Sequence, residues 1–460
     1  MEAGSDSMTH KPIAKILVPA GALGIPYDRQ ALTRGLKESP NLIAIDGGST
    51  DSGPFYLGSG TSKYSRQATK SDWSELMAAR AEAGIPLLIG TAGTCGTNDS
   101  VDWMIEITRE IAQERGETIK IASVKSSQDP QVIAEAWRAG KISKLEGAPE
   151  INADEIAELT NIVALAGVEP LQAALATDAD IIIAGRATDT AIIAALPLTM
   201  NCDPGAAWHG AKIGECGALA TNNPNSGVIL LSFDESGFTI KPMAENAQAT
   251  QQTVAAHMLY ENADPFILHE PGGYLDVREA RYECFENKSV RVEGSKWHTT
   301  CPYKVKLEGA RLAGFQTVSM VLLRDQNYVK NIRQWVAKLQ DSFTRKISKN
   351  NMPNVKLELR IIGLDATLGA LETREEPSAE LAVMAIFTAA EQKLANEAAK
   401  LLNPDLLHLP LESHEPMPTF AFPFSPPEMV RGPLYEFCLH HVMEVADPLS
   451  AFRIEVNEVK

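Results

Sequence analysis

The 460-residue sequence has no run of apolar residues long enough to cross a bilayer. Its longest apolar runs, such as Ile181–Ala184 and Val318–Leu323, fall far short of the roughly 20 residues that a spanning helix needs. The first ten residues, MEAGSDSMTH, lack the charged, apolar and small-residue layout of a signal peptide, and we expect a loose leader there. The sequence therefore predicts neither a membrane protein nor a secreted one.

Cysteine is scarce, and its spacing suggests no site. The sequence has no CxxC pair, so it predicts neither a disulfide framework nor a structural zinc site. Reduced thiols are typical of the cytoplasm, where we expect the protein to be located. The six cysteines are Cys95, Cys202, Cys216, Cys284, Cys301 and Cys438.

Basic residues are outnumbered. The 42 Lys and Arg against 59 Asp and Glu give a formal charge of −17, which excludes sequence-independent nucleic-acid binding because that needs a basic surface. An acidic surface does not exclude an anionic small molecule, since a pocket can collect basic groups locally. The hydrophobic fraction of 44% is normal for packed cores.

The first half of the chain alternates short aliphatic runs with helical patterns. This order is typical of βαβ units, so residues 1–225 are predicted to form an α/β domain with a mostly parallel sheet and flanking helices. The expected strands are Lys15–Ala20, Asn41–Asp46, Ile85–Gly90, Thr118–Val124, Asn161–Leu165 and Asp180–Gly185.

The second half has a different order of elements. Residues 226–410 are predicted to be an α+β domain, which from about residue 314 follows the order strand, helix, strand, strand, helix, strand of a ferredoxin-like fold. Residues 411–460 are predicted to be an extended linker and a short tail. The expected elements are Phe315–Leu323, Asn327–Lys346, Lys356–Gly363, Glu380–Phe387, Ala389–Leu402 and Leu406–Leu409.

Polar, glycine-rich loops follow three of the expected parallel strands. Right-handed crossovers bring the carboxyl ends of such strands to one edge of the sheet, where ligands bind in open α/β folds. The loop Asp46–Gly53 places a carboxylate and free N–H groups at this edge, which suits a polar ligand or a cation. Its alternative is a solvated turn, and we favour a binding role for Asp46.

The loop Gly90–Asp99 contains three glycines and three threonines before a predicted helix. Asn98 or Asp99 is the expected N-cap, and the first-turn N–H groups favour a carboxylate or phosphate. We therefore count Thr91, Thr94, Asn98 and Asp99 as substrate-binding candidates. The loop has neither a Walker A pattern nor GxGxxG, so nothing indicates a nucleotide.

The loop Gly185–Thr190 offers Arg186, whose guanidinium can grip a carboxylate with two hydrogen bonds. The alternative is an internal ion pair between Arg186 and Asp189. We favour contact with a ligand, and both residues are substrate-binding candidates.

Acid–base side chains gather in the segment Trp208–Gly217, where His209, Glu215 and Cys216 are the catalytic candidates. Elsewhere, His257 lies on an amphipathic helix and has a packing role as its simpler interpretation. The segment His269–Gly273 is a turn with an acid–base pair, and catalysis and packing are equally expected for it.

In order and spacing, these motifs resemble the acyclic terpene utilisation (AtuA-like) family over about residues 15–400. The resemblance implies that the recurrent Gly-Arg-Ala-x-Asp and Glu-Cys-Gly segments carry the function, through Arg186, Asp189, Glu215 and Cys216. It rests on the Asp46 loop and on the segments at residues 90–94, 184–190, 214–218, 253–254, 259–261, 264–265 and 306–310.

The family resemblance changes at the C-terminus. Longer AtuA-like proteins continue into an extra ferredoxin-like domain, and Pro433–Phe437 resembles its start, or the start of a small separate protein often paired with this family. Either the tail is a vestige or a small partner subunit supplies the missing part. The polar loops do not suit a long apolar terpenoid chain.

We therefore expect a catabolic enzyme, a hydratase, dehydratase or isomerase, that acts on a small carboxylate or its acyl derivative by proton transfer. The alternative is a metabolite-binding or scaffold subunit of a two-component complex. No cofactor motif is visible, although a divalent metal on Asp46, Asp51 or Asp189 is a third hypothesis. We also expect a homo-oligomer.

Overall fold

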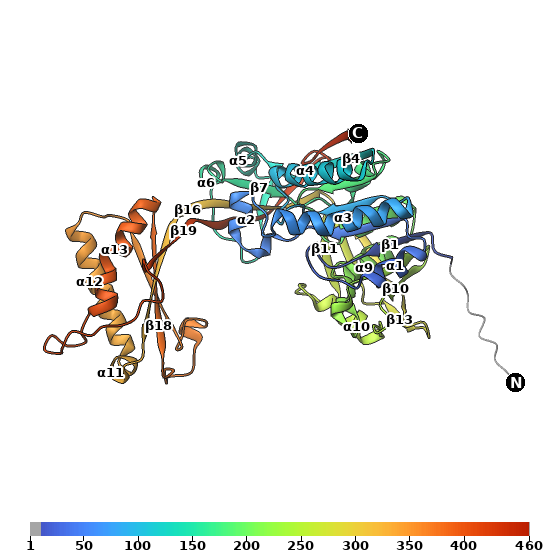
Figure 1. Cartoon of the computed structure of the whole chain (residues 1–460). Coiled ribbons are helices and arrows are strands. Elements are labelled where there is room, and N and C mark those ends of the chain that lie inside the picture. Colours follow the sequence, from blue (N-terminus) through green and yellow to red (C-terminus); the bar gives the residue numbers. More distant parts are fainter. Residues whose placement is uncertain (1–10, 460) are drawn as a thin grey trace. The chain divides into compact units, whose positions relative to one another are not determined.

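The computed structural model describes residues 11–459, so the leader expected at residues 1–10 lies outside the described residues (Figure 1). The chain divides into two compact units. Unit 1 comprises the residues up to Arg311 together with those from Phe437 onward, and unit 2 comprises Leu312–Glu436. The chain passes from unit 1 to unit 2 within one long strand, β16 (Tyr303–Leu323), and returns within another, β19 (Glu428–Val445).

Unit 1 is built on a ten-stranded sheet whose centre is parallel. Its parallel strands are, in spatial order, β1 (Ala14–Val18), β2 (Leu42–Asp46), β3 (Leu87–Gly90), β8 (Ile181–Ala184) and β4 (Ile119–Lys125). These strands read as continuous aliphatic runs because both faces of the sheet are covered.

The remaining strands of this sheet are antiparallel, so the sheet is mixed rather than mostly parallel. β9 and β10 are joined by a tight turn, which only antiparallel neighbours allow, and β9 runs against β1. The antiparallel strands are β9 (Ile229–Phe233), β10 (Gly237–Pro242), β14 (Val290–Glu293) and β13 (Arg281–Cys284) on one side and β20 (Arg453–Val459) on the other.

One strand expected in the parallel series lies elsewhere. β7 (Asn161–Ala164) pairs antiparallel with Leu307–Ala310 of β16 and with β5 (Ser127–Gln128). Its pairing partner is about 140 residues further along the chain, so no local pattern identified it. β6 (Ile142–Lys144) pairs with β19.

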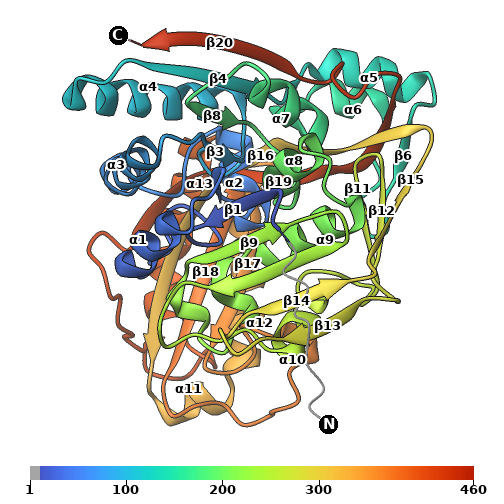
Figure 2. The same ribbon diagram turned by 90° about the vertical axis from the view of Figure 1, so that its right-hand side faces the viewer.

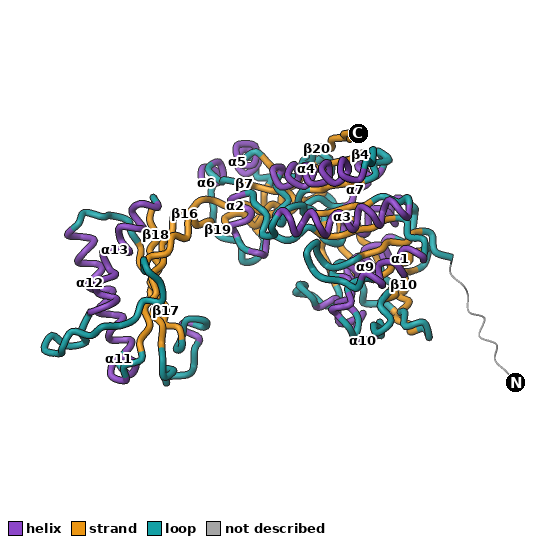
Figure 3. Tube along the Cα trace, viewed as in Figure 1, coloured by secondary structure: helices purple, strands orange, loops and turns teal. Residues whose placement is uncertain are grey.

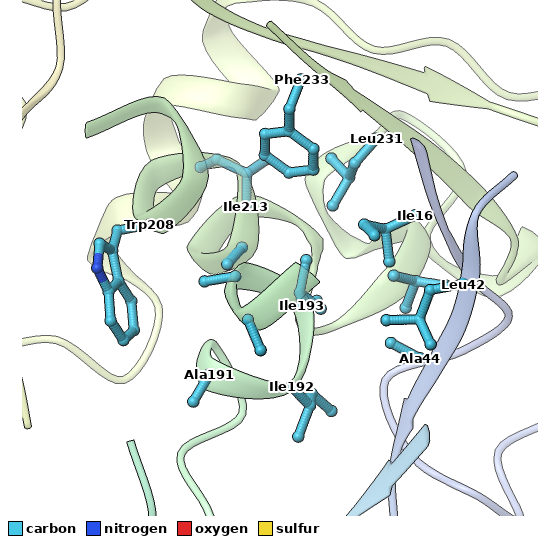
Figure 4. Close-up of a cluster of buried hydrophobic side chains, with 14 of the residues drawn as sticks. Ile16, Leu42, Ala44, Ala191, Ile192, Ile193, Trp208, Ile213, Leu231 and Phe233 are labelled. Atoms are coloured by element: carbon cyan, nitrogen blue, oxygen red, sulfur yellow. The ribbon is translucent and has the colours of Figure 1, made fainter. Parts of the chain in front are cut away.

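Helices cover both faces of the ten-stranded sheet. Leu17 and Ile43 point to a core shared with α1 (Arg29–Lys37), α3 (Arg66–Ala83) and α4 (Asn98–Arg115). Ile16 and Leu42 point to the opposite core, which contains Ile193 and Trp208 (Figure 4). The helices of that second face are α7 (Val168–Leu175), α8 (Ala191–Thr199) and α9 (Pro204–Gly214).

Smaller elements complete unit 1. A three-stranded sheet consists of β11 (Ile267–Glu270), β12 (Gly273–Asp276) and β15 (Lys296–Thr299). The short helices are α2 (Pro54–Ser59), α5 (Pro130–Arg138), α6 (Ala153–Ala157) and α10 (Gln251–Ala256).

Unit 2 has helices against one side of its strands (Figure 3). After β16 come α11 (Gln326–Lys330), α12 (Ile332–Lys349), β17 (Lys356–Ile362), β18 (Leu381–Ala389) and α13 (Gln392–His408), before β19. The strands lie in the order β17, β18, β16, β19. The expected strand at Leu406–Leu409 is wrong, because Leu402 and Leu406 continue the buried face of α13 at a helical spacing of four residues.

The segment expected to be a linker and short tail contains two paired strands. β19 belongs to the sheet that includes β16, and β20 pairs along its whole length with β4 at the edge of the ten-stranded sheet (Figure 2). No helix among the described residues is long and apolar enough to span a membrane.

Candidate functional site

The three polar loops meet at the carboxyl ends of β2, β3 and β8. Backbone hydrogen bonds join them: the N–H of Gly47 donates to Gly90 O at 2.7 Å, and that of Thr91 donates to Gly185 O at 2.9 Å. Gly96 approaches so closely that a Cβ atom there would lie 2.2 Å from the backbone nitrogen of Arg186. The glycines are therefore needed for close contact between loops.

The loop Gly90–Asp99 holds the other loops together, and none of its residues lines either of the two cavities found at this edge. Its N–H groups are already used: Ala92 donates to Ala184 O, and Thr94 to Gly47 O. The N-cap of α4 is Thr97, whose Oγ accepts from the N–H of Ser100 at 3.3 Å, so the expected cap at Asn98 or Asp99 is wrong. The loop leaves few N–H groups for a substrate.

The four binding candidates of this loop have structural partners or face solvent. Thr91 is fully buried and accepts a hydrogen bond from Arg186. Thr94 is fully buried and accepts from the N–H of Lys63 at 3.1 Å. Asn98 pairs with Ser127, and Asp99 is exposed.

Arg186 is buried and forms an ion pair with Glu308. Its Nε donates to Glu308 Oε2 at 3.0 Å, whereas Nη1 lies 3.7 Å from Asp189. Glu308 also accepts from the hydroxyl of Thr50 at 2.8 Å and lies 2.9 Å from Lys306 Nζ. Sequence reasoning missed Glu308 because it lies 122 residues from Arg186. The segment Lys306–Ala310, which carries part of the family resemblance, contains Glu308 and could have identified it.

The charges around Glu308 keep it ionised. Burial raises its pKa, but the nearby charges of Arg186 and Lys306 outweigh burial and lower the pKa to about 2. The hydrogen bond to Glu308 comes from the Nε of Arg186 and not from its two Nη groups. Its Nη1 donates to Thr91 and to Ala187 O, while its Nη2 donates to no described residue.

Two neighbouring cavities lie at this edge of the sheet and share Asp189 and Glu261. The arginine cavity, of about 540 Å³, is lined by Arg186, Thr190, Lys212, Glu215 and Glu270 among others. The cysteine cavity, of about 530 Å³, is lined by Gly21, Asp46, Asp51, Cys216 and Tyr260 among others. Both cavities belong to unit 1.

Lys212 and Glu215 form a buried ion pair where α9 ends. Lys212 Nζ donates to Glu215 Oε1 at 2.6 Å and to Tyr260 O at 2.8 Å. Burial raises the pKa of Glu215 to about 8, and the charge of Asp189 adds to this rise although Lys212 opposes it. Burial therefore outweighs the attraction of Lys212 in setting the pKa of Glu215.

Cys216 lines the cysteine cavity as a thiol. Burial raises its pKa, and the carboxylates of Glu215 and Asp189 raise it further. A thiolate is the reactive form of cysteine, so this environment does not favour a nucleophilic role.

His209 lies apart from both cavities. Its Nδ1 is 2.7 Å from the Ser295 hydroxyl, and its ring contacts Phe238 and Tyr282 edge-on. Burial lowers its pKa to about 3. Of the three catalytic candidates, the structure brings Glu215 and Cys216 together and leaves His209 in the core.

Glu270 is a buried acid of this edge, and the sequence indicated it as one member of an acid–base pair in the turn His269–Gly273. Its Oε1 accepts from the Thr190 hydroxyl at 2.5 Å, and its Oε2 is buried with no partner among the described residues. Burial raises the pKa of Glu270 to about 7, although hydrogen bonds from Thr190 and Thr188 oppose the rise. It lines the arginine cavity beside Asp189.

Two further acids lie between the cavities. Asp46 is buried, and its Oδ2 accepts from the N–H of Gly48 at 3.0 Å, while Oδ1 has no partner among the described residues. Burial and the charge of Asp189 raise the pKa of Asp46 well above its usual range. Burial also raises the pKa of the half-buried Asp189, whereas Arg186 lowers it. The site therefore has more acidic groups than basic ones.

Comparison with known proteins identifies the family. Residues 59–415 match the model of the family described as acyclic terpene utilisation family protein AtuA. No curated protein and no solved structure shows a significant match to the chain. The matched region covers most of the chain and includes the loop that carries Arg186, the end of α9 and Glu308. The chain belongs to the AtuA family.

Proposed function

We propose that this protein is a catabolic enzyme that acts on a small carboxylate or its acyl derivative by proton transfer, as a hydratase, dehydratase or isomerase. The observation that carries the proposal is the lining of the arginine cavity. Two cations with unused N–H groups, Arg186 and Lys212, line it together with Glu270, a carboxyl group whose pKa burial raises to about 7. Each part of this arrangement supports one step.

The two cations suit a substrate carboxylate or carbonyl oxygen. A lysine ammonium has three N–H donors, and the described contacts of Lys212 use two of them. Arg186 retains both N–H groups of Nη2. Both side chains line the arginine cavity, so an anionic oxygen placed there can accept hydrogen bonds from both.

Glu270 suits the proton transfer. Burial raises its pKa to about 7, so Glu270 can both give and take a proton near neutral pH. Its Oε2 has no hydrogen-bond partner among the described residues. In this proposal Glu270 removes a proton from the carbon next to the substrate carbonyl, while Arg186 and Lys212 stabilise the negative charge that forms on the oxygen.

Deuterium exchange tests the proposal without knowledge of the final product. The wild-type protein is incubated in D₂O with a panel of short branched carboxylates and their thioesters, and NMR follows the loss of the proton signal next to the carbonyl. Glu270→Gln is expected to slow exchange by ~100-fold or more, because Gln cannot accept the proton. The matched control is Glu279→Gln, which changes an exposed carboxylate of the same unit.

Exchange at the wild-type rate in Glu270→Gln would contradict the assignment. Binding of a panel member without any exchange in the wild-type protein favours the alternative, a metabolite-binding subunit of a two-component complex. The family description suggests a role in acyclic terpene utilisation, and the arginine cavity also offers the apolar side chains of Leu145, Leu165 and Leu268 to a substrate.

We also infer a cytoplasmic location and a ferredoxin-like fold for unit 2. The location is supported by Cys95, Cys202, Cys216, Cys284 and Cys301, which form no disulfide within the part of the chain that the structure describes. The fold is supported by the order strand, helix, strand, strand, helix, strand and by the strand order β17, β18, β16, β19.

A further inference from the structure

The end of α9 and the segment after α10 bring three metal-ligand side chains together. Glu215, Cys216 and His257 each offer one ligand atom, and these atoms all lie within 4.8 Å of one another. Within residues 11–459 no other group of three His, Cys, Asp or Glu residues meets this spacing, so the oxygen ligands expected from Asp46, Asp51 and Asp189 do not form such a group.

His257 supplies a second, independent sign of a ligand. The residue is only 5% exposed, and its Nε2 is buried with no hydrogen-bond partner among the described residues. Buried polar atoms nearly always have a bonding partner, so the unpartnered Nε2 of His257 indicates that a ligand binds there. The ring is stacked on Tyr260, with centroids 5.4 Å apart and planes 10° apart, which fixes its orientation.

We propose that Glu215, Cys216 and His257 bind a divalent transition metal ion of the zinc class. Thiolate, imidazole and carboxylate are together the ligand set that Zn²⁺ accepts. Ligand atoms at zinc-bond lengths lie about 3.3–3.8 Å apart in a tetrahedral site, so the three ligand atoms approach one another by at most about 1.5 Å on binding. This site goes beyond the proposed proton transfer, which does not require a metal.

The surroundings leave a coordination position open. Cys216 lines the cysteine cavity together with Asp189 and Glu261, and Glu215 lines the arginine cavity. A metal held by the three side chains would therefore face open space on the side of the cavities. Three protein ligands with a free fourth position are typical of catalytic rather than structural zinc sites.

Lys212 is the positive charge that opposes a cation here. Of the two carboxylate oxygens of Glu215, Lys212 contacts Oε1. No described residue donates a hydrogen bond to Oε2, so Oε2 can bind a metal. Four carboxylates line the cysteine cavity together with Cys216, and they outnumber the two nearby cations, Lys212 and Lys63 of the same cavity. The four are Asp46, Asp51, Asp189 and Glu261. The local balance of charge therefore favours a divalent cation.

Cobalt binding tests the site. Chelator-treated full-length protein is titrated with Co²⁺, and we expect one ion per chain, a near-ultraviolet thiolate-to-cobalt absorption band, and displacement by Zn²⁺. Cys216→Ser is expected to abolish the band, and His257→Gln to weaken Co²⁺ binding by at least ~10-fold. The controls are Cys284→Ser, an exposed cysteine, and His209→Gln, a buried histidine outside the group; both should bind as the wild type does.

Absence of Co²⁺ and Zn²⁺ binding in the wild-type protein, or a band that survives Cys216→Ser, overturns the proposal. Circular dichroism checks that each variant is folded. If His257→Gln unfolds, the absorption spectrum of the cobalt-loaded wild-type protein still shows whether a thiolate binds the metal. Glu270→Gln is expected to lose deuterium exchange and to keep full cobalt binding. Failure of the metal site is thereby separated from failure of the proposed function.

Discussion

Unit 1 and unit 2 bury different kinds of side chain. Unit 1 contains the buried charged residues Arg186, Lys212, Glu215 and Glu308. The core of unit 2 is aliphatic and aromatic, and its buried polar residues among those described are the hydroxyl residues Thr317, Ser319 and Ser342. Burying a charge is costly unless it is paired, whereas a hydroxyl needs only one hydrogen bond.

The difference between the buried hydroxyls of unit 2 and the buried charges of unit 1 indicates which unit contains the candidate site. The hydroxyls of unit 2 donate to side chains of α13, such as Asn396 and Asn403, and so they fasten strands to a helix. In unit 1, the buried charges of Arg186, Lys212 and Glu215 instead line the arginine cavity, although others, such as the Asp234–Arg291 pair, lie elsewhere. A fold retains such costly groups most readily where they perform chemistry. The candidate site therefore lies in unit 1, whereas the core of unit 2 consists of aliphatic and aromatic side chains.

The largest effect is expected from breaking the buried ion pair of unit 1. Glu308→Ala leaves the guanidinium of Arg186 buried without its main partner, so it should lower the free energy of unfolding by about 3–5 kcal/mol. Urea denaturation measures the loss, and hydrogen exchange assigns it to unit 1.

The matched control lies in unit 2. Glu358 and Arg360 form an ion pair at 2.7 Å with both side chains about half exposed. Glu358→Ala should cost less than about 1 kcal/mol, because water screens exposed pairs. Equal losses for the two variants would contradict the contrast between the units.

A packing variant of unit 2 should have the next largest effect. Leu339 is fully buried on α12, and Leu339→Ala should destabilise unit 2 by about 2–5 kcal/mol through the cavity that it creates. The expected result is faster hydrogen exchange in unit 2, with deuterium exchange into substrate unchanged. Loss of that activity at temperatures where unit 2 stays folded would show that unit 2 contributes to the site.

The smallest effect is a pH dependence that unit 1 should show and unit 2 should lack. In metal-free protein, folding raises the pKa of Glu270 to about 7 and of Glu215 to about 8. The folded state then binds more protons than the unfolded state between pH 6.5 and 8, so stability falls as the pH rises through this window.

Below pH 6.5 the trend should weaken. The pKa values of His209 and His257 are lowered to about 3 and about 4, so the unfolded state gains protons on these residues as the pH falls. Thermal unfolding from pH 6 to 8 measures the slope, and Glu270→Gln should reduce it. A slope that is unchanged in this variant would remove Glu270 as its source.

The secondary structure of the site region was largely predictable. The helix at Asn98–Arg115 was predicted from its apolar spacing, and the parallel strands from their aliphatic runs. The pairing of β9 with β1 and the position of β7 were not predictable, because antiparallel pairing with residues far along the chain leaves no local pattern. The helix that replaces the strand expected at Leu406–Leu409 shows how short apolar runs fit both periods.

The polar loops after β2, β3 and β8 were determined by the sequence itself, since right-handed crossovers place the ends of parallel strands at one edge. Only the tertiary structure decided what each residue of that edge does. It paired Arg186 with Glu308 and buried His209 in the core. It also placed Glu270 in the lining of the arginine cavity and His257 close to Cys216. The physical reason is that charge pairing and burial depend on contacts between distant segments, whereas periodicity and turn chemistry are local.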